Sequence, residues 1–236
     1  MLLNADVGEG LASDKLLFPY LDQANIACGS HAGNHRSMRQ AVTACVEHNI
    51  MIGAHPSYPD KENFGRVSVD ISSTELVQSL TKQIETLSNV CESLGASLSY
   101  IKPHGALYND IMVRFDLFNL VVELIANHSS HLSIMLGASL PRHFIDNANN
   151  RGITIIREAF ADRQYLSNGQ LSPRRFKGSV FNDIEKISSQ VSNLLDGTVL
   201  DEDGNSIELN AESICLHGDN PASVQAIANV AQILRS

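Results

Sequence analysis

Carboxylate, imidazole and amine side chains follow short apolar runs at several places along this chain. Asp6 and Glu9 come first, three residues apart in a segment that also holds Gly8 and Gly10. The later members of the set are His31, His55, Lys102, His104, Glu158, Asp162, Arg163, His217 and Asp219. Carboxylates and imidazoles move protons near neutral pH, and a fixed cation stabilises developing negative charge. These residue types are therefore suited to an active site.

Two features of this set allow more than one interpretation. Asp6 and Glu9 either form an acid–base pair or only order the loop that holds them. Lys102 emerges from an apolar run and precedes a proline, and a buried lysine is costly unless a carboxylate or a bound anion pairs with it. The residues alone leave both questions open.

A third feature is a pair of histidines with metal-ligand spacing. His31 and His35 are four residues apart, and two histidines at that spacing on one helix face bind a metal ion. Gly33 and Asn34, however, indicate that a helix begins between them. We therefore expect the two imidazoles not to share a helix face.

The apolar runs that carry these residues have the length of β-strands. The strand candidates are residues 2–4, 24–27, 50–54, 98–101, 132–136, 153–156 and 213–216. Most of them are apolar throughout, as is typical of parallel strands that are covered on both faces. The sequence therefore predicts an α/β protein with a parallel sheet.

Helical patterns fill the segments between the strands. An apolar stripe at helical spacing follows Asn34 and consists of Met38, Ala41, Val42, Cys45 and Val46. Residues 72–75 form a capping box, and Gly95 ends the helix that it starts. Helical patterns also cover residues 115–125 and 181–195, and Pro221 suits the first turn of a last helix. The alternation fits either an open, doubly wound sheet or a closed barrel.

In a closed barrel the carboxyl ends of all parallel strands meet at one mouth. On that basis we predict one cavity shared by Asp6, His31, His55, Lys102, Glu158 and His217. Residues 56–69 and 161–179 are long polar loops, and such loops inside a compact domain are usually functional. An active site at the mouth of the barrel is the expectation that follows.

Composition and charge narrow the class of protein. The chain has 236 residues and a formal net charge of −9, so nucleic acid and membrane surfaces are disfavoured as partners. We expect one domain over residues 1–236, because no linker or low-complexity tract divides the chain. The four cysteines, Cys28, Cys45, Cys91 and Cys215, lie in apolar stretches and are expected to be reduced and buried. Asp6 interrupts any secretory signal, so we expect a cytoplasmic protein.

The polar segments together resemble the family of 5-oxoprolinase A subunits, also called LamB/YcsF. The segments that carry the resemblance are Asn4–Gly10, Ala24–Gly33, Gly53–Asp60, Phe64–Arg66, Lys102–Asn109, Glu158–Arg163 and His217–Pro221. They occur in this order from the first predicted strand to the last helix, so the resemblance covers essentially the whole chain. Ser30, His35 and Leu2 depart from the family pattern, and Ser30 lies beside His31 at the predicted mouth.

The resemblance implies a fold and a reaction. The fold is a TIM-like, seven-stranded (β/α) barrel of the glycoside hydrolase/deacetylase type. The reaction is the ATP-dependent hydrolysis of 5-oxo-L-proline (pyroglutamate) to L-glutamate, in which ATP, with Mg²⁺, is converted to ADP and phosphate. The implied partners are the B and C subunits of 5-oxoprolinase. The chain has no Gly-x-x-x-x-Gly-Lys-Ser/Thr loop, so either ATP is held in another mode at the mouth or the partners supply that step.

The resemblance also implies roles for the polar residues. The catalytic candidates are Asp6, Glu9, His55, Lys102 and Glu158. The substrate-binding candidates are His31, His104, Asn109, Asp162, Arg163, His217 and Asp219. Whether the chain holds a bound transition metal is left open by these patterns.

Two other functions remain as alternatives. The first is a metal-dependent, deacetylase-like hydrolase of an amide or carbohydrate, with Asp6, His31 and His55 as ligands and water as the nucleophile. The second is a binding protein that holds a small acid for its partners.

Overall fold

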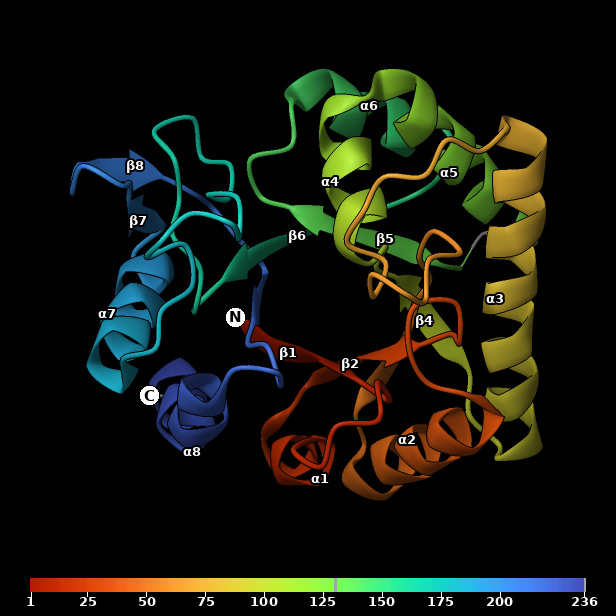
Figure 1. Ribbon diagram of the computed structural model, residues 1–236, viewed down its shortest axis with the longest axis horizontal. Coiled ribbons are helices and arrows are strands. Elements are labelled where there is room, and N and C mark those ends of the chain that lie inside the picture. The colour runs from red at the N-terminus through yellow and green to blue at the C-terminus, as the bar shows by residue number, and fades with distance from the viewer. Residues whose placement is uncertain (130, 236) are drawn as a thin grey trace.

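The computed structural model describes residues 1–129 and 131–235, and a closed barrel of seven parallel strands forms its centre (Figure 1). The strands are β1 (Leu2–Val7), β2 (Gln23–Ala27), β3 (Met51–His55), β4 (Leu98–Ile101), β5 (Ser133–Gly137), β6 (Ile155–Phe160) and β9 (Ser213–Cys215). They pair in chain order, and β9 closes the barrel by pairing with both β1 and β6. The predicted parallel α/β architecture is confirmed in its closed form.

Helices surround the barrel. They are α1 (Asp14–Leu17), α2 (His35–His48), α3 (Ser73–Ser93), α4 (Gly105–Val113), α5 (Phe115–His128), α6 (Arg142–Asn150), α7 (Ile184–Leu195) and α8 (Pro221–Arg235). A short 3-10 turn, η1 (Phe18–Tyr20), follows α1, and the hairpin of β7 (Thr198–Leu200) and β8 (Ser206–Glu208) lies outside the barrel. Figure 1 shows α2 and α3 on one side of the barrel and α7 and α8 on the other. The long loops after β3 and β6 follow the carboxyl ends of their strands and therefore lie at the mouth.

The predicted helix starts are confirmed where a capping side chain marks them. Ser72 accepts a hydrogen bond from the backbone N–H of Glu75 at 3.3 Å, and Glu75 accepts one from the N–H of Ser72 at 3.2 Å. Asn34 caps α2, so His31 precedes the helix and does not share a face with His35. The helix predicted from residue 181 instead begins at Ile184, because the carboxylate of Asp183 caps its first N–H groups.

Three strand ends differ from the prediction in a way that matters for the site. β3 was predicted to end at residue 54 but includes His55. β1 continues to Val7 and β6 continues to Phe160, so Asp6 and Glu158 lie within strands and not after them. The apolar runs stop early because the inward positions of these strands are polar. The helices α1, α4 and α6 and the β7–β8 hairpin were not predicted.

The inside of the barrel holds a hydrogen-bonded polar layer below the mouth. Asn25 donates to Asn4 and to Asp6, both at 2.8 Å, and it accepts from the Tyr100 hydroxyl at 2.7 Å. Asn4 also donates to Ser213 at 2.8 Å. Because side chains alternate along a strand, the same inward rows lead from Asn4 to Asp6 and from Tyr100 toward the mouth. Buried polar groups in this layer are paired, so the layer is a rigid floor for the site.

The described residues contain no helix that is long and apolar enough to cross a membrane. All four cysteines are free thiols and buried, as their apolar surroundings predicted.

Gly53 is required by the packing of the barrel interior. A Cβ at this position would overlap the ring of Tyr100, which fills the barrel centre. We expect Gly53→Ala to lower the free energy of unfolding by at least about 1–3 kcal/mol, the usual cost of overpacking. Chemical denaturation measures this cost. In a Tyr100→Leu background the added cost should shrink, and an equal cost in both backgrounds would contradict this packing.

Candidate active site

The floor of the mouth is a buried ammonium group between two carboxylates. Nζ of Lys102, which follows β4, lies 3.0 Å from Oδ1 of Asp6 and 2.7 Å from Oε1 of Glu158. All three side chains are almost completely buried, although Asp6 reaches the cavity above. The second oxygen of Glu158 accepts a hydrogen bond from the hydroxyl of Tyr108 at 3.1 Å. The expected anionic partner of the buried lysine is therefore a pair of carboxylates.

The electrostatics of this cluster keep both sides charged. Burial alone would lower the pKa of Lys102, but the nearby negative groups, led by Asp6, outweigh it and hold the pKa well above the usual value. Burial alone would raise the pKa of Asp6, but His55 and Lys102 together hold it well below its usual range. An ionised carboxylate and an ammonium group are thus in place at neutral pH.

Two imidazoles lie beside Asp6 in a fixed orientation. Nδ1 of His55 lies 2.8 Å from the carbonyl oxygen of Lys102, and Nε2 of His104 lies 2.9 Å from that of Phe64. A carbonyl only accepts, so both of these ring nitrogens carry hydrogen. The remaining nitrogens, Nε2 of His55 and Nδ1 of His104, lie 2.9 Å from each other. Burial and the charge of His55 hold the pKa of His104 well below its usual value.

His31 and Glu9 complete a cluster of four groups. The ring of His31 stacks on that of His104 with centroids 3.8 Å apart, and its Nε2 lies 3.4 Å from Oε1 of Glu9. Burial lowers the pKa of His31 to about 3, and burial with the charge of Asp6 raises the pKa of Glu9 to about 7. Neither nitrogen of His31 has a hydrogen-bond partner among the described residues, and nor does Oε1 of Glu9.

The loop after β3 places this cluster through an unusual backbone. Phe64 has φ of +56°, a left-handed conformation that is costly for a bulky residue, and its carbonyl fixes His104. Gly65 follows with φ of +64°, and a Cβ there would lie 2.9 Å from Cβ of His31 and 3.0 Å from Cδ2 of His104. The loop over residues 56–69, which was predicted to be functional, thus holds His31 and His104 against its own backbone.

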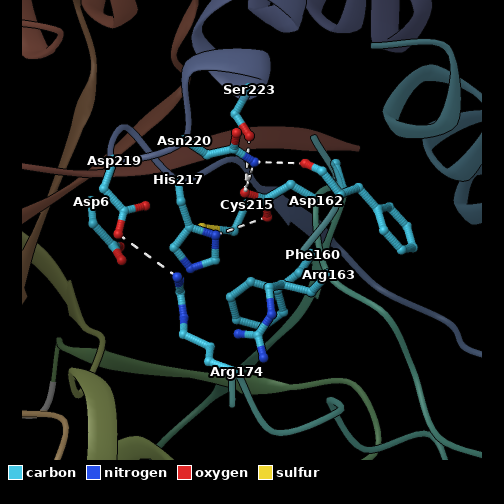
Figure 2. A network of polar contacts seen from close by, with 12 residues as sticks. Asp6, Phe160, Asp162, Arg163, Arg174, Cys215, His217, Asp219, Asn220 and Ser223 are labelled. Atoms are coloured by element: carbon cyan, nitrogen blue, oxygen red, sulfur yellow. Dashed lines mark hydrogen bonds and ion pairs between the residues drawn. The ribbon is translucent and has the colours of Figure 1, made fainter. Parts of the chain in front are cut away.

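The opposite side of the mouth carries a histidine held by an aspartate. Nδ1 of His217 donates to Asp162 at 2.8 Å, and the ring stacks on Phe160 (Figure 2). Asp162 also accepts from Ser223 at 2.9 Å and from Asn220 at 3.3 Å. Since Nδ1 is engaged, Nε2 of His217 is the nitrogen available for proton transfer to a ligand.

Arginines and an aspartate line the rim of the cavity. The cavity has a volume of about 370 Å³, and Arg66, Arg163, Arg174 and Arg175 line it together with Asp219. Asp219 lies 2.7 Å from Arg66 and 3.7 Å from Arg174, and so joins the loop after β3 to the loop after β6. The rim is positively charged, which favours an anionic ligand.

A smaller cavity of about 260 Å³ adjoins the first one. Tyr108, Asn109 and Phe160 line both cavities, and the second cavity extends toward Met112 and Gly137. The two cavities together provide more room than a small acid requires.

The structure brings most of the predicted site residues to this mouth. The main cavity is lined by Asp6, Glu9, His55, Lys102, His104, Asn109, Arg163, His217 and Asp219. Glu158 borders the second cavity, while His31 and Asp162 lie behind the walls, where they contact lining residues. Arg163 is also tied to the backbone of the long loop, since its guanidinium donates to the carbonyls of Ser172 and Ser179. The roles of these residues stay predictions.

Sequence reasoning did not include several lining residues in the site. They are Arg66, Tyr108, Phe160, Arg174 and Arg175. Arg66, Tyr108 and Phe160 stand inside the segments that carry the family resemblance, so that signal was available. Arg174 and Arg175 stand in a long loop whose path over the mouth has no local signature.

Comparison with models of protein families shows the family of this chain. The model of the LamB/YcsF family matches residues 1–236. This chain belongs to the LamB/YcsF family.

Relatives within the family match nearly their whole length. The chain is 42% identical to the 5-oxoprolinase A subunit 2 of Pseudomonas putida, with 99% of this chain and 93% of that protein covered. It is 39% identical to the 5-oxoprolinase A subunit of Vibrio cholerae, with 97% and 95% covered. The crystal structure of the lactam utilization protein from Thermus thermophilus matches with a TM-score of 0.88 at 30% identity, covering 100% of this chain and 97% of that one. The family resemblance and the seven-stranded, TIM-like (β/α) barrel that it implies are confirmed.

The Asp162–His217 pair gives a pH-dependent prediction. Burial would raise the pKa of Asp162, but His217 and the other hydrogen-bond donors outweigh it and lower the pKa to about 2. Since the unfolded value is near 3.9, the ionised carboxylate stabilises the fold above about pH 4, and this contribution is lost as pH falls through the folded value. The stability gap between the native chain and Asp162→Asn should therefore narrow by about 2 kcal/mol from pH 5 toward pH 2.

Chemical denaturation across this pH range measures that gap. Asp146→Asn is the control, because Asp146 is exposed on α6 and its carboxylate pairs only with Arg142 among the described residues. A gap for Asp162→Asn that stays constant with pH would contradict the assigned ionisation.

Proposed function

We propose that this chain is the A subunit of an ATP-dependent 5-oxoprolinase, which hydrolyses 5-oxo-L-proline to L-glutamate. The observation that carries the proposal is the floor of the mouth, where Lys102 lies between Asp6 and Glu158 under a cavity with a positive rim. The names of relatives about 40% identical over nearly the full chain support the same activity.

The cavity suits a small anionic lactam. The substrate carboxylate pairs with Arg66 and Arg174 at the rim. Both arginines lie near the carboxylate of Asp219 and can exchange it for the carboxylate of the ligand. The polar lactam ring then lies over Asp6 and Lys102, and the apolar face of Phe160 contacts its methylene groups. A cavity of about 370 Å³ is at the lower end of the usual range for small ligands.

The reaction needs activation of a stable amide and then proton transfers. Phosphoryl transfer from ATP to the lactam oxygen releases ADP and makes the ring carbon a better electrophile. Water adds to that carbon, and the ring C–N bond breaks with a proton delivered to nitrogen, which leaves the acyl phosphate of glutamate. A second water hydrolyses this acyl phosphate to glutamate and phosphate. We assign removal of the water proton to Asp6 and proton delivery to His217, which Asp162 orients. Lys102 stabilises negative charge on the oxygens of the intermediate.

ATP with Mg²⁺ and the B and C subunits belong to the same proposal. The chain has no phosphate-binding loop of the Gly-x-x-x-x-Gly-Lys-Ser/Thr type. The rim arginines supply a positively charged place for the phosphate that is being transferred. The water-addition and ring-opening steps are the ones that the residues of this chain are equipped to perform.

An assay of glutamate release tests the function. Purified chain should release no glutamate from 5-oxoproline by itself, and release should require both ATP and the B and C subunits. Each turnover should form one ADP and one phosphate. Release of glutamate by this chain without ATP would contradict the proposal and favour the alternative of an ATP-independent hydrolase.

Asp6→Asn tests the proton-transfer role. The substitution keeps the shape and the hydrogen bond from Asn25 but removes the base, so turnover of the assembled enzyme should fall about 10²–10⁴-fold. Binding of 5-oxoproline should change little, whereas Lys102→Met should weaken binding together with turnover. Steady-state kinetics and calorimetry separate these effects. Near-normal turnover of Asp6→Asn would make Asp6 a positioning residue.

A further inference from the structure

Four side chains beside the mouth bring potential ligand atoms close together. They are Glu9, His31, His55 and His104, and one ligand atom from each lies within 4.8 Å of the other three. The separations include 2.9 Å between His55 and His104 and 3.4 Å between His31 and Glu9. Ligand atoms about 2.1 Å from a tetrahedral metal ion are about 3.4 Å apart, and the separations in this cluster lie on both sides of that value.

The outer hydrogen bonds of two of these rings match those of metal-ligating histidines. His55 donates its Nδ1–H to the carbonyl of Lys102, and His104 donates its Nε2–H to the carbonyl of Phe64. Histidines that ligate metals typically donate the other ring N–H to a carbonyl or carboxylate, which fixes the ring and its tautomer. The left-handed backbone of Phe64 provides one of these acceptors at a cost in conformational energy.

The other two groups, His31 and Glu9, are buried without the hydrogen bonds that their polar atoms need among the described residues. Both nitrogens of His31 and Oε1 of Glu9 are buried without a hydrogen bond among the described residues. An unpaired buried polar atom costs about 1–3 kcal/mol, and here three such atoms lie together. A hydrogen shared between His55 and His104 accounts for those two rings only, whereas one cation accounts for all four side chains.

We propose that Glu9, His31, His55 and His104 bind one divalent transition-metal ion of the zinc class. Three imidazoles and one carboxylate are ligands that suit zinc, cobalt, nickel and iron and suit magnesium or calcium poorly. The negative charge of Asp6 beside His55 favours a cation at this place.

This site differs from the metal site considered among the alternatives. Asp6 is paired with Lys102 and is not one of the four ligands, while Glu9 and His104 are. Glu9, His55 and His104 line the main cavity, so the ion would be accessible to a ligand bound there. The proposal is independent of the substrate, since it concerns only what these four side chains hold.

Titration of the full-length, chelator-treated chain with zinc alone, followed by calorimetry, tests the site. One ion should bind per chain, and Co²⁺ added in place of zinc should give the visible absorption of a four- or five-coordinate ion. Glu9→Gln and His31→Asn should each weaken zinc binding about 100-fold or more, because each removes a direct ligand. If His31→Asn does not fold, Glu9→Gln, which keeps the shape of the side chain, is the variant that tests the metal site.

The matched control is His35→Asn. His35 is four residues from His31 but exposed on the first turn of α2, so its loss should leave zinc affinity unchanged. The absence of stoichiometric binding to the native chain would overturn the proposal. Zinc binding that is unaffected by both ligand substitutions would also overturn it, because the ion would then belong to surface histidines.

Discussion

The ammonium group of Lys102 is the constraint on which the rest of this site depends. It lies inside the barrel, where an unpaired charge would be prohibitively costly, and it is held by carboxylates from β1 and β6. These ion pairs join Lys102, which follows β4, to β1 and β6. They also hold Asp6 in place. Oδ2 of Asp6 in turn lies 3.3 Å from Nε2 of His55 and so helps to orient that ring. Removing Lys102 would leave two buried carboxylates without their cation.

Charge balance explains how the two sides of the mouth differ. On one side a buried imidazole cluster lies against the carboxylates of Asp6 and Glu9, and on the other Asp162 holds His217 in one tautomer. Arginines at the rim attract an anion, and the ionised floor then acts on its polar part. In the proposed function the rim binds the substrate carboxylate, whereas Asp6 at the floor and His217 transfer protons.

Much of this arrangement could be predicted from the sequence, because an ionisable residue after an apolar run must lie at the mouth of a parallel barrel. His55, Lys102 and His217 were placed correctly on that basis. Asp6 and Glu158 were placed beyond their strands, because an inward polar side chain within a strand resembles the end of the strand. The pairing of Lys102 with two particular carboxylates, and the arrival of Arg174 at the rim, depend on contacts distant in sequence that no local pattern encodes.

The central claim is that Lys102 is a charged ammonium group held by Asp6 and Glu158. NMR of the chain labelled with ¹³C at the lysine Cε position tests it directly, with the Lys102 signal assigned by its loss in Lys102→Met. The pKa of this lysine is expected well above its usual value, so the Cε shift should stay constant between about pH 6 and about pH 10. A titration of that signal below about pH 9 would show that burial outweighs the two carboxylates and would contradict the account.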